Sequence, residues 1–432
     1  MEFKMLNVID EKLSKTIIDE VKKNIEYLIY RYKNNLIEKN NYNDILFYSS
    51  ILLNQNIDEY YDSKLKEIII YILSRIKEDF QNFMSYSISM FDGLGQLAYS
   101  VNTVSKKTGE LINLSYSLDE YLLDFSYNLL NHIKYEPIYC GFYDVISGIS
   151  GVLYYFLDKK DSFIANNKMK LVEMINFLMN LSKNYSYKGE NIINFHIKKN
   201  QQTDKEKQNM IEGHINFGLA HGIMGPLITL AKCKELGFYV KGLDASIIRL
   251  FEVYEKFCIR DDGVLKYPTK LSLQNYIKNS PNNLSFNCGW CYGNISIVRG
   301  LMKVSNILKR NEKYEYYKKE LLNIINQPIE KYNLKSPIVC HGYSSVIGIQ
   351  ISAYRETKDK RFLNTLNRNL LKVIEKHESI ISNDKEKNEE EINYKELYQQ
   401  DYSLLNGSGG VIMMLMNSIS GDLKFNKILM VD

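Results

Sequence analysis

Short apolar runs that begin with closely spaced glycines recur along the chain. In each run, Val, Leu, Ile or Met residues follow the glycines, which is the pattern of a helix that starts at a tight turn and is buried on most sides. The leading glycines lie 49 to 74 residues apart, which leaves room for two helices and their loops in each interval. Six runs follow this pattern, at residues 91–99, 147–155, 221–228, 292–298, 341–348 and 406–413.

Longer segments between these runs carry apolar residues at helical spacing on one face and Lys and Glu on the other. Examples are residues 17–34, 61–80 and 314–326. Amphipathic helices of this kind suit a solvated outer layer. The pattern therefore predicts an all-α protein in which an inner ring of apolar helices is wrapped by an outer ring of amphipathic helices. No linker rich in Pro, Ser or Gly divides the chain, so we expect a single domain over residues 1–432.

Two charged segments interrupt the repeating pattern. Residues 198–208 and 382–391 contain many charged and few large apolar side chains. We therefore expect charged surface insertions near residues 185–213 and 380–400. Residues 185–197 alternate weakly between apolar and polar, which predicts a short strand pair.

Composition narrows the possible functions. The net charge of +4 is spread along the length without a basic block, which argues against a role with nucleic acid. Residues 1–20 mix acidic and basic side chains and lack a long apolar stretch, so we expect a cytoplasmic protein that is not integral to a membrane. Six cysteines are too few for a disulfide scaffold and suggest buried thiols or metal ligands. We expect Cys140, Cys233 and Cys258 to pack in the core.

Cys291 and the pair Cys340-His341 fall at the same point of two successive glycine runs. A closed ring of such segments would bring the two thiols and the imidazole together. Two thiolates and a neutral imidazole offset the charge of Zn²⁺, and a catalytic zinc commonly has three protein ligands and one open position. These residues therefore predict a zinc site that leaves one position for a substrate.

The repeats and the motifs Trp290-Cys291-Tyr292-Gly293 and Cys340-His341-Gly342 resemble those of the lanthionine synthetase C family, the lanthipeptide cyclases. Further matches are Tyr143-Asp144-Val145-Ile146 and Gly218-Leu219-Ala220-His221-Gly222. The resemblance covers nearly the whole chain. It implies an α/α toroid with seven helices in each layer, and the only candidate for a seventh inner helix is residues 47–53, which lack the glycines.

The resemblance also implies a site and a reaction. Zinc would be bound by Cys291, Cys340 and His341, with Asp144, His221 and Tyr292 lining the cavity. The reaction would add a peptide cysteine to dehydroalanine or dehydrobutyrine and so form a lanthionine or methyllanthionine thioether ring. The substrate would be a dehydrated precursor peptide with an N-terminal leader. A dehydratase and an export transporter are implied as partners, through which the protein would lie at the membrane periphery.

The candidate side chains suit this chemistry. Zinc would keep the incoming thiol deprotonated. His221 could take the thiol proton and return it to the α-carbon, because imidazole titrates near neutral pH. Asp144 could orient His221 through the other ring nitrogen, and Tyr292 could donate to the enolate oxygen.

One catalytic position departs from the family pattern. The family usually carries arginine four residues before the first zinc cysteine, where this chain has Asn287. An arginine there could orient Asp144 or stabilise the enolate. Asn287 can still donate hydrogen bonds, but a neutral donor stabilises an anion about half as well as a charged one.

The candidate residues also allow other interpretations of the site and of the protein. Cys288 and Cys291 form a Cys-x-x-Cys pair that could be a redox dithiol, or Cys288 could be a fourth ligand that closes a structural zinc site. His221 could also be a capping residue held in place by packing, and Asp144 could cap a helix that begins near Val145. The whole protein could be a non-catalytic scaffold that binds a precursor peptide or a modification partner, or another enzyme that alkylates a zinc-bound thiolate, such as a prenyl transferase.

Overall fold

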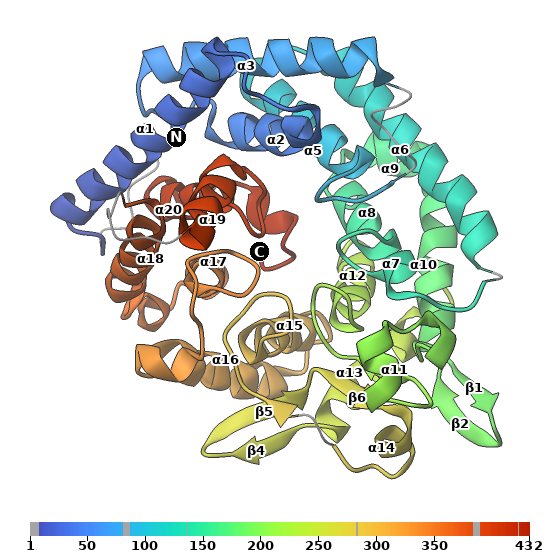
Figure 1. The fold of residues 1–432 in the computed structure, drawn as a ribbon. Helices are drawn as coiled ribbons and strands as arrows, with labels where there is room; N and C mark the ends of the chain where they lie inside the picture. The colour runs from blue at the N-terminus through green and yellow to red at the C-terminus, as the bar shows by residue number, and fades with distance from the viewer. Residues whose placement is uncertain (1–7, 81–86, 135, 282–283, 383–388, 422) are drawn as a thin grey trace.

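The computed structural model describes residues 8–80, 87–134, 136–281, 284–382, 389–421 and 423–432. Within these residues, helices alternate along the chain between an outer and an inner layer and close into a ring (Figure 1). The ring closes where the last inner helix packs against the first two long helices of the chain. The predicted all-α toroid is therefore confirmed.

The inner layer contains the apolar helices that the glycine runs predicted. Its members are buried on most sides; in the last of them, every residue from Ser408 to Ile419 is buried. Within the described ranges this layer comprises seven helices: α2 (Tyr42–Leu52), α5 (Leu94–Thr108), α8 (Ile149–Phe156), α12 (Met224–Glu235), α15 (Asn294–Ile307), α17 (Tyr343–Thr357) and α20 (Ser408–Ser420).

The outer layer contains the amphipathic helices. Each packs one face on an inner helix and presents its charged face to solvent. In the part of the chain that the structure describes, its long members are also seven: α1 (Glu11–Lys33), α3 (Glu59–Glu78), α6 (Ile112–Ile133), α10 (Lys168–Ser182), α13 (Leu243–Lys256), α16 (Asn311–Asn326) and α18 (Leu366–Ile381).

Helix α2 is the seventh inner helix, and it contains most of the glycine-free candidate at residues 47–53. It packs between α5 and α20. The Nδ2 of Asn43 on α2 donates to the backbone oxygens of Asp92 and Gly93, at 3.2 and 3.3 Å. A side-chain amide thus ties α2 to the loop that precedes α5.

The glycines at the starts of the inner helices permit close approach of backbone rather than an unusual φ. Gly93, Gly148, Gly293, Gly342 and Gly407 are the N-cap residues of α5, α8, α15, α17 and α20, all with negative φ. A Cβ on Gly151 would lie 2.1 Å from the backbone oxygen of Val145. The preceding loop can therefore lie directly on the first turn of the helix only where a side chain is absent.

Short strands and short helices connect the long helices of the ring. The strand pair expected near residues 185–197 is present as β1 (Asn184–Tyr187) and β2 (Glu190–Ile193), which are antiparallel. Strand β3 (His214–Asn216) pairs with β6 (Lys270–Ser272), and β5 (Val264–Pro268) pairs with both β4 (Ile259–Asp261) and β7 (Leu284–Ser285). The short helices are α7 (Cys140–Tyr143), α9 (Asp161–Asn166), α11 (Asp204–Asn209), α14 (Leu273–Ile277) and α19 (Glu389–Gln400), and the 3₁₀ turns lie at Lys39–Asn41, Lys199–Gln201, Ile329–Tyr332, Lys360–Leu363 and Phe425–Lys427.

The segment after α20 turns into the middle of the ring, where the C-terminus lies (Figure 1). Its apolar side chains, from Leu423 to Val431, are buried. The indole Nε1 of Trp290 donates to the backbone oxygen of Leu429 at 2.8 Å, and Nε of Arg299 donates to that of Val431 at 3.2 Å. This segment thus packs directly against the loop that carries Cys291. No helix within the described ranges is both long enough and apolar enough to span a membrane.

Candidate functional site

The two predicted metal-binding loops lie side by side at the starts of α15 and α17. The backbone N–H of Cys291 donates to the backbone oxygen of Cys340 at 3.1 Å, and that of Cys340 donates to Leu405 at 2.9 Å. These bonds bring the sulfur atoms of Cys291 and Cys340 and a ring nitrogen of His341 within 4.8 Å of one another. The three side chains are therefore close enough to share one metal ion.

The donor set fits zinc. The thiol of Cys340 donates a hydrogen bond to the sulfur of Cys291, which lowers the pKa of Cys291 and raises that of Cys340. The interaction of His341 with Cys291 raises the pKa of the imidazole. Two sulfurs and an imidazole that compete for protons in this way are the soft and borderline donors that zinc prefers.

Cys288 does not join this group. It is fully buried, which raises its pKa, and Nε2 of Gln327 lies 3.7 Å from its sulfur. Among the described residues, the cluster of potential metal ligands at this point consists of Cys291, Cys340 and His341. The arrangement therefore disfavours both the redox dithiol and the four-ligand structural site.

Asp144 and His221 meet although they are far apart in sequence. Asp144 follows α7 and is buried, whereas His221 stands on the loop before α12 and is partly exposed. The Nδ1 of His221 lies 2.5 Å from Oδ2 of Asp144, and the backbone N–H of Ser147 donates to Oδ1 at 2.8 Å. Because Asp144 occupies Nδ1, Nε2 is the ring nitrogen that can exchange a proton with a substrate.

Tyr292 lies beside this pair. Its ring centroid is 6.4 Å from that of His221. Burial raises the pKa of Tyr292 to about 12, so its phenol stays protonated at neutral pH. The Nδ2 of Asn216 donates to the phenol oxygen at 3.3 Å, which leaves the Tyr292 O–H able to donate to another group.

Asn287 lies on the loop that carries Cys291, and its side chain forms a hydrogen bond with the backbone of that loop. Its Oδ1 accepts a hydrogen bond from the N–H of Gly289 at 2.9 Å. In the described part of the chain, no hydrogen bond or ion pair joins a Lys or Arg to Asp144. Lys335 lines the cavity that these groups share, and Lys270 lies near it, with its Nζ 5.8 Å from the ring centroid of Tyr292 and 2.5 Å from Oε1 of Glu206.

A cavity of about 710 Å³ joins these groups. Its open side gives access from solvent, and its size can accept a short stretch of peptide. The residues that line it include His221, Asn287, Trp290, Cys291, Tyr292, Cys340 and His341. All of the predicted site residues except the buried Asp144 therefore face one cavity.

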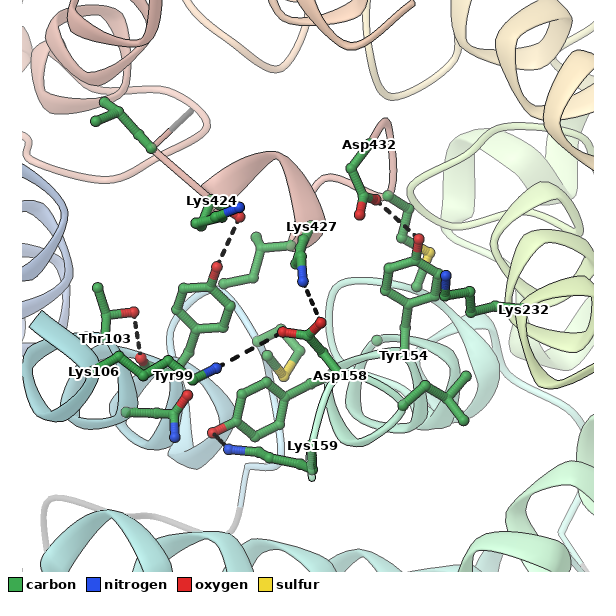
Figure 2. A pocket seen from close by; sticks show the side chains of 18 of the residues that line it. Tyr99, Thr103, Lys106, Tyr154, Asp158, Lys159, Lys232, Lys424, Lys427 and Asp432 are labelled. Atoms are coloured by element: carbon green, nitrogen blue, oxygen red, sulfur yellow. Dashed lines mark hydrogen bonds and ion pairs between the residues drawn. The ribbon is translucent and has the colours of Figure 1, made fainter. Parts of the chain in front are cut away.

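A second cavity, of about 280 Å³, is lined by residues of α5 and α8 and of the segment after α20 (Figure 2). Lys106, Lys107 and Lys232 stand in the last turns of α5 and α12, where positive charge offsets the negative end of the helix dipole. The Nζ of Lys107, for example, donates to the backbone oxygens of Ser50, Ile51 and Leu53 at the end of α2. Asp158 pairs with Lys427 and Lys106. These charged groups connect parts of the ring to one another. None of the predicted site residues lines this cavity.

The sequence did not identify Cys140, near the first cavity, as a potential metal ligand. Cys140 packs against the core as predicted, but its sulfur also lies within 4.8 Å of ligand atoms of Asp144 and His221. The signal was its position four residues before Asp144, one helical turn away. No periodic pattern showed that His221 would meet the same turn.

Comparisons with known proteins agree with this geometry. The family model of lanthionine synthetase C-like proteins matches residues 44–430. The nisin biosynthesis protein NisC of Lactococcus lactis subsp. lactis is 28% identical over 327 residues, which are 73% of this chain and 71% of NisC. A solved structure of nisin cyclase has the same fold, with a TM-score of 0.78 and 23% identity, over 95% of this chain and 97% of the cyclase.

Proposed function

The chain belongs to the lanthionine synthetase C-like family, and from this premise we propose that it is a zinc-dependent cyclase that closes thioether rings in a dehydrated precursor peptide. The observation that supports this most directly is a single cavity that holds both a zinc-type donor set and a carboxylate-oriented histidine. The names of the similar proteins, a nisin biosynthesis protein and a nisin cyclase, agree with such an activity.

Five side chains of the cavity and the buried Asp144 have roles in the proposed reaction. Cys291, Cys340 and His341 would hold zinc, which supplies a Lewis acid that favours the thiolate form of a peptide cysteine. His221 would accept the thiol proton at Nε2, while Asp144 keeps the ring in the required orientation. Tyr292 would donate to the carbonyl oxygen on which negative charge develops.

The proposed reaction is a single addition of the thiol across the double bond, in which no atom is lost. The cysteine sulfur bonds to the β-carbon of the dehydroamino acid as the carbon–carbon double bond is lost. The proton that left the thiol returns from His221 to the α-carbon. Because His221 and Tyr292 lie on the same side of the cavity, the proton donor and the oxyanion donor can act on neighbouring atoms of one residue.

The test is ring closure in a peptide that carries one dehydroalanine and one cysteine. The zinc-loaded protein should consume the free thiol at mildly acidic pH, where the uncatalysed addition is slow because the thiol is protonated. His221→Asn should retain zinc and slow ring closure by about 10²-fold or more, the usual contribution of a proton-transfer group. Mass spectrometry after alkylation counts the remaining thiols.

His132→Asn is the matched control, because His132 lies exposed on α6 in the outer layer. It should close rings at the wild-type rate. A wild-type protein that binds zinc and the peptide but leaves the thiol free would instead support the scaffold reading. An undiminished rate in His221→Asn would remove this residue from the mechanism.

A further inference from the structure

A second group of metal-ligand side chains lies beside the cavity. Cys140 opens α7, Asp144 directly follows that helix, and His221 comes from the loop before α12. One ligand atom from each of these residues lies within 4.8 Å of the others. The zinc residues of the proposed function are not part of this group.

We propose that Cys140, Asp144 and His221 form a second zinc site, and that zinc bound there inhibits the enzyme. One thiolate, one carboxylate and one neutral imidazole carry two negative charges, as the first donor set does, and each is a recognised zinc ligand. The inhibitory part rests on the proposed function, because it assigns proton transfer to His221.

The carboxylate and the imidazole already face each other. The N–H of Ser147 holds Oδ1 of Asp144, so Oδ2 is directed to Nδ1 of His221, 2.5 Å away. A metal ion bound to both atoms would displace the proton between them, and with bonds of about 2.0 Å it would hold Nδ1 and Oδ2 farther apart, so the partly exposed ring of His221 would shift outward to admit it. The sulfur of Cys140 would be the third ligand. With the metal on Nδ1, the neutral ring of His221 would carry its proton on Nε2, and this nitrogen could then no longer accept the proton of a substrate thiol.

This site should bind zinc more weakly than the first. Burial and the charge of Asp144 raise the pKa of the Cys140 thiol to about 11, so zinc must displace a proton to gain this ligand. The other charged groups that act on Cys140 are Glu206 and Lys270, and they pair with each other at 2.5 Å. Their charges largely offset, so neither excludes a divalent cation from the cluster.

The first experiment counts metal and does not depend on catalysis. Protein that holds one zinc is titrated with further zinc, and the bound metal is measured after equilibrium dialysis. We expect the wild type to take up a second equivalent and Cys140→Ser to lose this uptake. Cys258→Ser is the matched control, since Cys258 is another half-buried thiol outside both ligand groups, and it should behave as the wild type does.

A spectroscopic measurement identifies the ligand. Cobalt(II) added to the one-zinc protein should give a thiolate-to-metal charge-transfer band in the wild type and in Cys258→Ser, but not in Cys140→Ser. The second site is refuted if the wild type takes up no further zinc, or if Cys140→Ser keeps both the uptake and the band.

The inhibition is tested separately, with each variant compared with its own rate at one equivalent of zinc. Excess zinc should slow ring closure in the wild type and in Cys258→Ser, with much less effect in Cys140→Ser. Equal inhibition in all three proteins would overturn the inhibitory role. If no protein closes rings, the proposed function fails, while the metal count still decides whether the second site exists.

Discussion

At the scale of single residues, the contacts of Asn287 bear on the role of the family arginine, which could orient Asp144 or stabilise the enolate. Its side-chain oxygen caps the N–H of Gly289, and its backbone oxygen accepts from the N–H of Asn294 at 2.9 Å. Asn287 therefore shapes the loop that carries Cys291. The described residues hold Asp144 in place with Ser147 and His221 and without an arginine. An added cation at this position would thus act mainly on the substrate.

We predict that Asn287→Arg raises the rate of ring closure by roughly tenfold, which corresponds to about 1.4 kcal/mol of transition-state stabilisation. A charged donor gains more from developing negative charge than a neutral amide does. Asn287→Gln is the control, because it loses the cap on Gly289 without adding charge. The measurement is the single-turnover rate with zinc content checked, and a slower, zinc-loaded Asn287→Arg would count against this role.

At the scale of elements, the inner helices depend on the absence of particular Cβ atoms. Gly151→Ala would place a methyl group 2.1 Å from the backbone oxygen of Val145, which cannot move without displacing the loop before α8. We expect a loss of about 3 kcal/mol in the free energy of unfolding, at the upper end of overpacking costs. Urea denaturation followed by circular dichroism would measure it.

Gly348→Ala provides the matched comparison on α17. The new methyl group would lie 2.9 Å from Cε of Met414, the end of a flexible side chain that can move aside. The higher helix propensity of Ala, about 1 kcal/mol over Gly, should offset most of that adjustment. Equal destabilisation in the two variants would show that close backbone approach is not what requires the glycine at position 151.

The contact between α2 and α5 should make stability depend on pH. Asp44 on α2 accepts a hydrogen bond from Nε2 of Gln96 on α5 at 2.9 Å, and burial raises the pKa of Asp44 to about 7. The usual pKa of an unfolded Asp is about 4, so between these values the folded protein binds more protons than the unfolded chain. The free energy of unfolding therefore falls as the pH rises through this window.

Asp44→Asn should remove this contribution while the amide oxygen still accepts from Gln96. We expect its melting temperature to rise relative to the wild type as the pH increases from about 4 to about 8. Asp19→Asn, at an exposed position on α1, is the control and should show no such trend. A constant difference between Asp44→Asn and the wild type across the range would contradict the raised pKa.

At the scale of the whole molecule, contacts within the protein hold the loops that carry the proposed zinc ligands. Backbone hydrogen bonds connect Cys291 to Cys340 and Cys340 to Leu405, and the indole of Trp290 is anchored on Leu429. These contacts belong to a continuous apolar core that extends through both helical layers. A core of this size supplies the folding energy without a metal ligand.

Removal of zinc by a chelator should therefore abolish ring closure but leave the helical circular-dichroism signal intact. We expect the melting temperature to fall by less than about 10 °C, the scale of ligand linkage in a large protein. Zinc should restore both quantities. Cooperative loss of the helical signal on chelation would show instead that the metal is a structural element.

The sequence by itself determined the features that are local and that repeat along the chain. The glycine runs predicted the inner helices, and the shared register of Cys291 with Cys340 and His341 predicted that they would meet. The family resemblance implied a seventh inner helix, and α2, which lacks the glycines, contains most of the apolar run that was the candidate for it. These predictions held because a helix and its cap are specified by residues a few positions apart, and a repeat transfers that information around the ring.

Only the tertiary structure decided what fills and surrounds the site. Cys140 lies close to His221, 81 positions later in the sequence, and the C-terminal segment contacts Trp290 through the backbone of Leu429. The pairing of Glu206 with Lys270 depends on where α11 lies against β6. Such contacts are set by the closure of the ring and by the volume left inside it, which no periodicity in the chain records.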